Sequence, residues 1–262
     1  MTVSRNDVVT FLAGVNDQFE QFCTRYNPAG RVDKKSWDTS MGRLDAVRSS
    51  GAVFEKAASI FCDLTIETPP VLAEKLGQRG STAEAFVLEI NCYPVNTHIH
   101  RGYMELRANI TDTVVFAGGT DIFPYFPVDE DAAFFAGGMK ELCGEHGQDY
   151  EALRKTRADF FVSKFRNAKV GSHAGIYAFH LEAKAFPFVK DMAGYFFRLY
   201  GILAEKGGKR NFTADEQQRM REIHGTWVEW VLLEDSGTRY GLKKGIPPDA
   251  LLGAILPPQA TF

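Results

Sequence analysis

The chain has 262 residues, of which 45% are hydrophobic and 24% are charged, and these fractions are typical of a packed globular protein. Its net charge of −3 at pH 7 argues against a surface that binds nucleic acid or anionic membranes. No stretch of apolar residues is long enough to predict a membrane-spanning helix. Phenylalanine is unusually frequent, with 21 residues, which favours a thick core or a cavity for a large planar ligand.

The four cysteines are far apart in sequence and form no CxxC pair, so we expect neither a zinc site nor a disulfide framework. Reduced thiols and a polar, acid-containing N-terminal segment favour a cytoplasmic protein without a signal peptide. No linker rich in proline, glycine or serine divides the sequence. We therefore expect a single domain over residues 1–262. The cysteines are Cys23, Cys62, Cys92 and Cys143.

The first half of the chain predicts one helix followed by several strands. Residues 4–25 place apolar side chains on one helical face, whereas residues 26–50 show no regular pattern and are expected to form a loop. Short connections between the strands predict antiparallel neighbours rather than a Rossmann unit. The predicted strands cover residues 58–66, 85–92, 98–110 and 111–116, with a short helix around 71–76.

The second half is mainly helical. Its helices are expected near residues 131–143, 148–166, 186–205 and 248–252, with another helix beginning at Thr213, a typical N-cap residue. Strands are expected at 174–181 and 227–233. Together these elements predict an α+β fold in which a single large, mainly antiparallel β-sheet is flanked by α-helices on both faces.

A glycine-containing stretch at residues 114–126 is the strongest candidate for a functional site. An apolar strand loses its side chains at Gly118 and Gly119, and one carboxylate, Asp121, follows. Glycines at a strand end allow another backbone or a flat ligand to approach closely, and the acid could then accept donors from that ligand. The alternative is a glycine turn whose aspartate caps its own backbone.

Two histidines are further candidates. His98 and His100 are two residues apart in a predicted strand, so their side chains are expected on the same face. Such a pair is compatible with a structural role, with substrate binding or catalysis, or with a metal site completed by a third ligand. Glu229 lies between two tryptophans, Trp227 and Trp230, and is either solvent-facing or an acid with a raised pKa.

The order of these segments resembles the oxygen-dependent coproporphyrinogen III oxidase family. The likeness runs from about residue 37 to residue 258 and combines several short motifs with similar spacing. They are VFEKA (53–57), FAGGTDIFP (116–124), KELC (140–143), DFF and FRN (159–161 and 165–167), WVEW with DSGTRYGL (227–230 and 235–242), and ILPP (255–258).

This resemblance implies a flat antiparallel sheet between helices, a homodimer and a deep cleft. It also implies an enzyme that needs no metal or organic cofactor and uses O₂ as co-substrate to convert propionate side chains of a reduced tetrapyrrole into vinyl groups. Asp121 corresponds to the aspartate that receives the pyrrole N–H groups, and such charge-assisted hydrogen bonds stabilise a ring that becomes positive as it is oxidised. Arg166 matches an arginine that can bind a substrate carboxylate.

The sequence departs from the family at several positions. The histidine expected as proton donor falls on His100, or on His98 if the register shifts by two. Family asparagine and arginine positions are occupied by Gly102 and Met104. The substrate-binding GGR triplet becomes Gly-Ile-Pro at residues 245–247.

Other side chains could compensate for these losses. Arg101 and Arg107 are the candidates, and Glu229 joins the possible substrate-binding residues. Because each lost charged hydrogen bond weakens the binding of a four-carboxylate substrate, a smaller and less anionic pyrrole- or indole-like compound is also possible.

Three functional hypotheses follow. The first is a cofactor-free, O₂-dependent oxidase acting on coproporphyrinogen or on a smaller heterocycle. The second is a homologue that binds a tetrapyrrole or another planar ligand without chemistry. The third is a metalloenzyme that uses His98 and His100.

Overall fold

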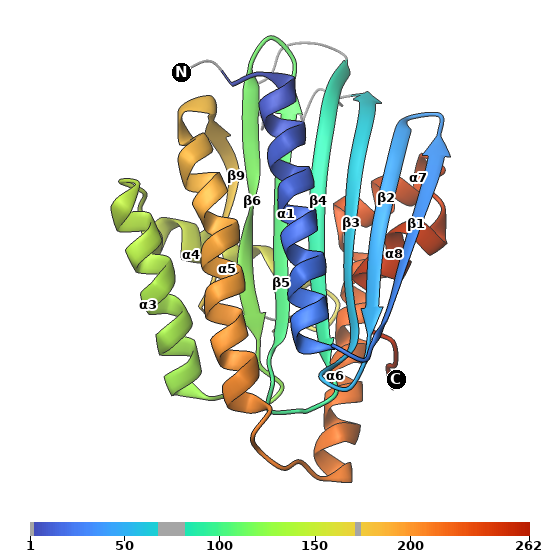
Figure 1. The fold of residues 1–262 in the computed structure, drawn as a ribbon, viewed down its shortest axis with the longest axis vertical. Helices are drawn as coiled ribbons and strands as arrows, with labels where there is room; N and C mark the ends of the chain where they lie inside the picture. The colour runs from blue at the N-terminus through green and yellow to red at the C-terminus, as the bar shows by residue number, and fades with distance from the viewer. Residues whose placement is uncertain (1–2, 68–81, 171–173) are drawn as a thin grey trace.

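The computed structural model describes residues 3–67, 82–170 and 174–262. Its centre is a seven-stranded sheet in which every pair of neighbouring strands is antiparallel (Figure 1). Six strands follow each other along the chain, and the last one joins beside β6. In sheet order they are β1 (Arg31–Thr39), β2 (Gly42–Ser50), β3 (Phe54–Glu67), β4 (Thr82–Pro94), β5 (Arg101–Ile110), β6 (Val114–Phe123) and β9 (Ile176–Glu182).

Helices cover both faces of this sheet, which confirms the predicted fold class. In front of the sheet in Figure 1 lie α1 (Arg5–Tyr26), α3 (Asp129–Glu145) and α5 (Phe186–Gly207). Behind it lie α6 (Ala214–Leu233), α7 (Ser236–Lys243) and α8 (Pro248–Ile255), whereas α4 (Tyr150–Phe160) packs along β9. The remaining elements are short: β7 (Val162–Ser163), β8 (Ala168–Lys169) and η1 (Ala183–Ala185).

Two hydrophobic cores result, one on each face of the sheet. The first contains the buried sides of α1, α3 and α5, and α1 is held there by apolar residues at helical spacing, such as Val8, Leu12 and Val15. The second contains residues of α6 and α8, with Tyr103 and Phe123 from the sheet. All four cysteines are buried free thiols.

The expected loop at residues 26–50 is wrong, because most of this segment forms the β1–β2 hairpin. Strand β1 is the edge of the sheet and seven of its nine residues are polar or charged, so it has no apolar alternation to signal it. The two strands pair along their full length, and Thr39 pairs with Gly42 next to the turn of the hairpin. Edge strands of this kind are poorly predicted by hydrophobic period alone.

The expected strand at residues 227–233 is also wrong, because these residues are the last two turns of α6. The helix begins at the Thr213–Glu216 capping box and continues through Gly225 to Leu233 with no proline inside it. Its buried residues Met220, His224, Trp227 and Val231 follow a helical spacing of three or four residues. Within residues 3–67, 82–170 and 174–262, no helix is both long and apolar enough to cross a membrane.

Several boundaries differ from the prediction. Strand β5 begins at Arg101, and β6 continues through the glycines to Phe123, so Asp121 lies inside a strand and not in a turn after it. Helix α4 ends at Phe160 and is therefore shorter than the helix predicted over residues 148–166. The helix expected around residues 71–76 lies outside the described residues.

The glycines of β6 allow close contact with the backbones of both neighbouring strands. Gly118 has φ +129°, and a Cβ there would lie 2.1 Å from the carbonyl oxygen of Glu105 on β5. At Gly119 a Cβ would lie 2.0 Å from the carbonyl oxygen of Ile176 on β9. The absent side chains therefore admit a backbone, which is one of the two close approaches that the sequence allowed.

We predict that Gly118→Ala lowers the free energy of unfolding by about 2–4 kcal/mol, because alanine is strained at this φ and its Cβ meets a fixed backbone oxygen. Gly14→Ala is the matched control: a Cβ at Gly14, inside α1, meets nothing within 4 Å. It is expected to stabilise the protein by up to about 1 kcal/mol. Urea unfolding at pH 7 measures both, and equal effects of the two substitutions would contradict this account.

Candidate functional site

Asp121 is fully buried on the sheet face that carries the second core. Its neighbour Ile122 belongs to the first core, and because side chains alternate along a strand, Asp121 points to the opposite face, as Phe123 does. Its Oδ1 accepts the backbone N–H of Ile122 at 2.7 Å, and the carboxylate also accepts the N–H of Gly175. Burial raises the pKa of Asp121 to about 6, against the opposing effect of a nearby arginine.

That arginine is Arg157 of α4. Its Nε lies 3.3 Å from Oδ2 of Asp121, and both side chains have no exposed surface. The guanidinium carbon is 3.4 Å from the ring centre of Phe161 and 4.9 Å from that of Tyr103. Within the described part of the chain, none of its three nitrogens makes a hydrogen bond, and neither does Oδ2 of Asp121. The site therefore holds a buried ion pair with unused hydrogen-bonding capacity.

Sequence reasoning missed Arg157, although a signal existed. Along α4, Tyr150, Leu153 and Arg157 follow the i, i+3, i+7 spacing of a buried helical face. A charged residue at the third of these positions needs a buried partner, since an unpaired guanidinium is costly in a core. The sequence alone does not reveal that this partner is Asp121, because the two residues meet only through tertiary packing.

A second buried arginine, Arg101, shares this face of the sheet. It pairs in register with Phe123, next to the Tyr103–Asp121 pair. Its guanidinium carbon lies 3.9 Å from the ring centre of Phe123 and 3.7 Å from that of Trp227, so it is sandwiched between two aromatic rings. Its Nε and Nη2 have no hydrogen-bond partner in the part of the chain that the structure describes. The structure thus brings Arg101 and Asp121, both predicted from sequence, into one layer.

Arg107, another sequence candidate, has a partner of its own. Its Nη2 donates to Oε1 of Glu105, whose Oε2 accepts the hydroxyls of Tyr103 at 3.0 Å and Tyr177 at 2.9 Å. Burial tends to raise the pKa of Glu105, but Arg107 and the two hydroxyls hold it below its usual value. Opposite, burial and the charge of Glu105 raise the pKa of Glu89 to about 8. Glu105 and Arg107 therefore form a closed, neutral pair.

The two candidate histidines do not form the same-face pair that was expected. Both precede β5, and their side chains bind different elements. His98 donates from Nε2 to the carbonyl oxygen of Asn211 at 3.0 Å. His100 donates from Nε2 to Asp131 of α3 at 2.9 Å, and Lys206 of α5 holds the same carboxylate at 2.7 Å. Burial lowers the pKa of His100.

Among the described residues, these histidines also form no metal site with the groups around them. In the part of the chain that the structure describes, no cluster of three or more histidine, cysteine, aspartate or glutamate side chains is arranged to hold a metal ion. The contacts of His98 and His100 are instead structural: they connect the segment before β5 with the surrounding helices.

A different histidine, His224 of α6, lies near Arg101. Its Nε2 accepts the hydroxyl of Tyr125 at 2.8 Å, and its Nδ1 donates to the carbonyl oxygen of Gln259 at 2.9 Å. These partners fix a neutral tautomer, and burial lowers the pKa of the ring to about 4. Because both ring nitrogens are occupied, His224 serves to position Tyr125 and the segment around Gln259.

Arg166 and Glu229, both candidates for substrate binding, bind each other. Arg166 lies in the turn between β7 and β8, and its Nη2 donates to Oε1 of Glu229 on α6 at 2.6 Å, with a second bond from Nε. Their side chains are 49% and 31% exposed. They therefore form a bidentate pair at the surface, separate from the buried layer of Asp121.

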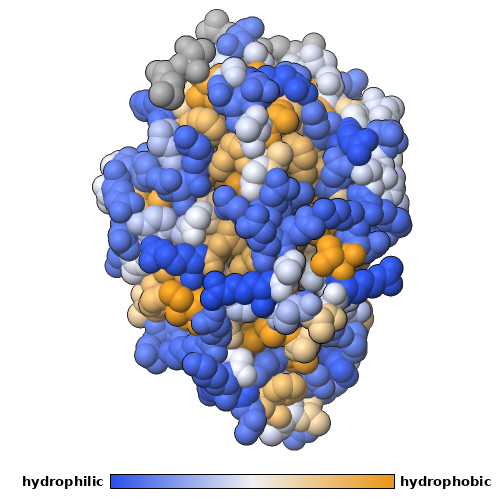
Figure 2. Space-filling view, viewed as in Figure 1, coloured by the Kyte–Doolittle hydropathy of each residue, from blue (hydrophilic) through white to orange (hydrophobic). Residues whose placement is uncertain are grey.

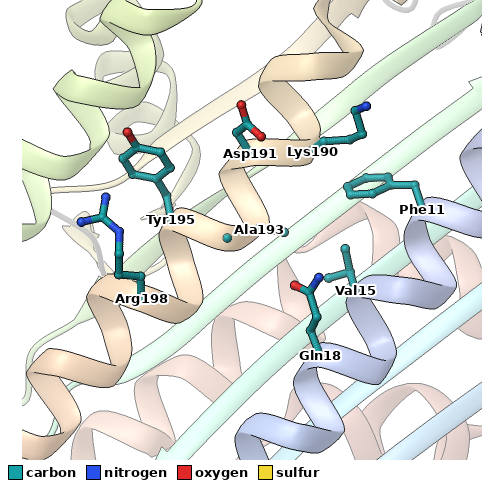
Figure 3. Close-up of a pocket in the computed structure, with 9 residues that line it drawn as sticks. Phe11, Val15, Gln18, Lys190, Asp191, Ala193, Tyr195 and Arg198 are labelled. Atoms are coloured by element: carbon teal, nitrogen blue, oxygen red, sulfur yellow. The ribbon is translucent and has the colours of Figure 1, made fainter.

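The described residues also line a pocket of about 320 Å³ between α1 and α5. Figure 3 shows Phe11 extending from α1 toward α5 and Lys190 extending from α5 toward α1, whereas Tyr195 points away from α1. In Figure 2, pale apolar residues follow the seam between these helices, among hydrophilic side chains. This pocket lies on the first-core side of the sheet, opposite the face to which Asp121 points.

Comparison with known proteins identifies the family. Residues 7–262 match the family model described as coproporphyrinogen III oxidase. The chain belongs to the coproporphyrinogen III oxidase family. Its relatives include oxygen-dependent coproporphyrinogen-III oxidases from Drosophila melanogaster (28% identical over 231 residues), Francisella philomiragia (26% over 227) and Francisella tularensis subsp. holarctica (28% over 228).

The matched regions cover 81% of this chain in each case. They cover 59% of the Drosophila protein and 72% of each Francisella protein, so the chain spans only part of the length of these family members. The resemblance inferred from short motifs is thus confirmed at the level of the family, and this chain is a divergent member of it.

We predict that His224 makes the fold less stable in mild acid. Its pKa is about 4 in the folded protein and near 6.5 when unfolded, so the unfolded state binds the proton more readily. Stability is therefore fully present above about pH 6.5 and is lost as pH falls toward 4, by about 2 kcal/mol at pH 5.

Urea unfolding at pH 7 and pH 5 measures this loss. His224→Gln keeps a polar side chain but does not titrate, and it should remove this part of the pH dependence. An identical pH dependence in the variant and the natural protein would show that His224 is not the group responsible.

Proposed function

We propose that this protein is an O₂-dependent oxidase that acts on a reduced, N–H-bearing pyrrole heterocycle: coproporphyrinogen, or a smaller pyrrole- or indole-like compound. The observation that carries the proposal is the buried Asp121 in a member of this family: its Oδ2 has no hydrogen-bond partner among the described residues, and it lies among aromatic side chains. A fully buried carboxylate with an unused acceptor is suited to a ring N–H.

The chemistry required of Asp121 is electrostatic. An electron-rich pyrrole becomes positively charged as electrons pass to O₂, and a fixed carboxylate beside its N–H stabilises that charge without having to reorient. If a propionate side chain reacts, the propionate anion, O₂ and one proton give a vinyl group, CO₂ and H₂O₂. The two electrons of the substrate reduce O₂ directly, so we propose no metal or organic cofactor.

Arg101 is the best-supported partner for a substrate carboxylate. It is buried on the same face as Asp121, and two of its nitrogens have no acceptor, which is unfavourable until an anion or water supplies one. Arg107 and Arg166 are weaker candidates, because each has its own carboxylate partner. A proton-donating role for His100 or His98 stays a prediction, as does substrate binding by Glu229, Gly118 and Gly119.

The alternative function is binding of a planar ligand without oxidation. One observation favours it: Asp121 is already paired with Arg157, so part of its negative charge is neutralised before any ligand arrives. Tight ligand binding without O₂ uptake distinguishes this alternative from the oxidase.

The family resemblance also leads us to propose a homodimer. We further propose that residues 1–262 form one domain, which is supported by the packing of both α1 and α8 against β3. A cytoplasmic location belongs to the same proposal, and its support is that the four cysteines are reduced and buried.

We predict that Asp121→Asn lowers the rate of O₂ consumption with coproporphyrinogen by at least about 100-fold, because the substitution keeps the shape but removes the charge that stabilises the oxidised ring. An oxygen electrode and product chromatography measure the rate. Asp38→Asn is the control, since that side chain is 85% exposed. Unchanged turnover by folded Asp121→Asn would refute the assigned role.

We also predict that the rate falls about tenfold per pH unit below pH 6, because protonation of Asp121, whose pKa is about 6, removes the charged acceptor. A pH–rate profile from pH 5 to 8, with circular dichroism to verify folding at each point, measures this. A flat profile down to pH 5 would show that the ionised carboxylate is not required.

A further inference from the structure

The ion pair between Asp121 and Arg157 has more hydrogen-bonding capacity than the protein uses. Among residues 3–67, 82–170 and 174–262, Oδ2 of Asp121 and all three nitrogens of Arg157 find no hydrogen-bond partner, and both side chains have no exposed surface. The nearest walls are the rings of Phe161, Tyr103 and Phe123, whose faces attract a cation but accept no conventional hydrogen bond. The large majority of buried polar groups in folded proteins are hydrogen-bonded, so a water or a ligand is expected here.

The local charge balance favours an anionic ligand. Asp121 is the carboxylate that compensates Arg157, and Arg101 also acts on it electrostatically. The charge of Glu105 is compensated by its ion pair with Arg107. Two buried acid–base groups nearby, Glu89 and His224, add no negative charge at pH 7, because Glu89 is protonated below its pKa of about 8 and His224 is neutral. Two guanidinium groups therefore share one carboxylate, and one positive charge is left over.

The geometry of the pair restricts how a ligand can use it. Nε of Arg157 and Oδ2 of Asp121 are 3.3 Å apart, so an N–H donor for an anion and an acceptor for a ring N–H lie side by side. A ligand that binds both without separating them needs its own N–H and its own carboxylate equally close together. A carboxylate on the ring carbon next to a pyrrole N–H has this arrangement, whereas a propionate attached further round the ring is too distant to reach both at once.

We propose that Asp121 and Arg157 form a composite binding site for a heterocycle that carries a carboxylate next to its ring N–H, with pyrrole-2-carboxylate as the simplest example. The N–H binds Oδ2 of Asp121 and the carboxylate binds the guanidinium of Arg157. This inference rests on the proposed function only in placing the substrate at Asp121. It makes Arg157 the residue that selects the smaller, carboxylated heterocycle.

The test is a binding measurement by ligand-observed NMR and calorimetry at pH 7.5 under nitrogen, with the full chain and three probes. Pyrrole-2-carboxylate offers both groups side by side. Pyrrole-3-carboxylate separates them, and N-methylpyrrole-2-carboxylate lacks the N–H. We expect the first probe to bind at least about tenfold more tightly than either of the others, since each of these lacks one charge-assisted hydrogen bond.

Substitutions identify the residues. Arg157→Gln should weaken binding of pyrrole-2-carboxylate at least about tenfold, and Arg157→Lys, which keeps the charge without the planar fork, should restore part of it. Asp121→Asn should abolish the preference over the N-methyl probe. Arg154→Gln is the control on the same helix, because its side chain is 46% exposed, and it should bind as the natural protein does.

Equal affinity for the three probes, or binding that Arg157→Gln leaves unchanged in a folded variant, would overturn the inference and indicate that only water occupies the pair. Oxygen uptake with coproporphyrinogen is measured separately, so the two proposals fail independently. Turnover without selective probe binding rejects the composite site and keeps the oxidase. Selective probe binding without turnover of any heterocycle supports the composite site and rejects the oxidase.

Discussion

The close packing of β6 between β5 and β9 is the constraint on which the rest of this structure depends. At Gly118 and Gly119 the neighbouring backbones occupy the space that a Cβ would fill, and Gly175 lies in the same way against the side chain of Asp121. Asp121 is consequently buried within the sheet, and its side chain faces α4. Substituents on these glycines would separate the strands and open the carboxylate to water, where its pKa would return toward its usual value.

The resulting buried layer contains charged side chains that are packed against aromatic rings. Arg101 is sandwiched between Phe123 and Trp227, and Arg157 lies on Phe161. Cation–π contact replaces part of the hydration that these guanidinium groups lose, but it does not satisfy their N–H donors. The protein thus keeps two oriented donor groups in a water-poor environment, which is the state in which electrostatic recognition is strongest. A family scaffold with this content suits a ligand that combines a planar ring with an anionic group.

The sequence predicted the sheet, the helices on both faces and the family, because strongly periodic segments such as α1 and α5 and the motif around Asp121 are local signals. The predictions from sequence were wrong for segments whose secondary structure depends on tertiary packing. Strand β1 is a polar edge, and the tryptophan-rich end of α6 has residues that suit either a strand or a buried helix. Of the buried charged residues in the candidate site, the sequence pointed to Asp121 and Arg101 but not to Arg157, which meets Asp121 only through tertiary packing. Arg166 and Glu229, also named from the sequence, bind each other.

The stacking of Arg101 on Trp227 has an optical consequence. The indole lies 3.7 Å from the guanidinium carbon and its ring centre is 5.2 Å from that of Trp230, so its emission depends on the position of one cation. Any molecule that draws that cation toward itself alters the field at the excited indole. Trp227 is therefore an internal fluorescent reporter. The intrinsic fluorescence of the unlabelled protein can follow the binding of a ligand that itself absorbs no visible light.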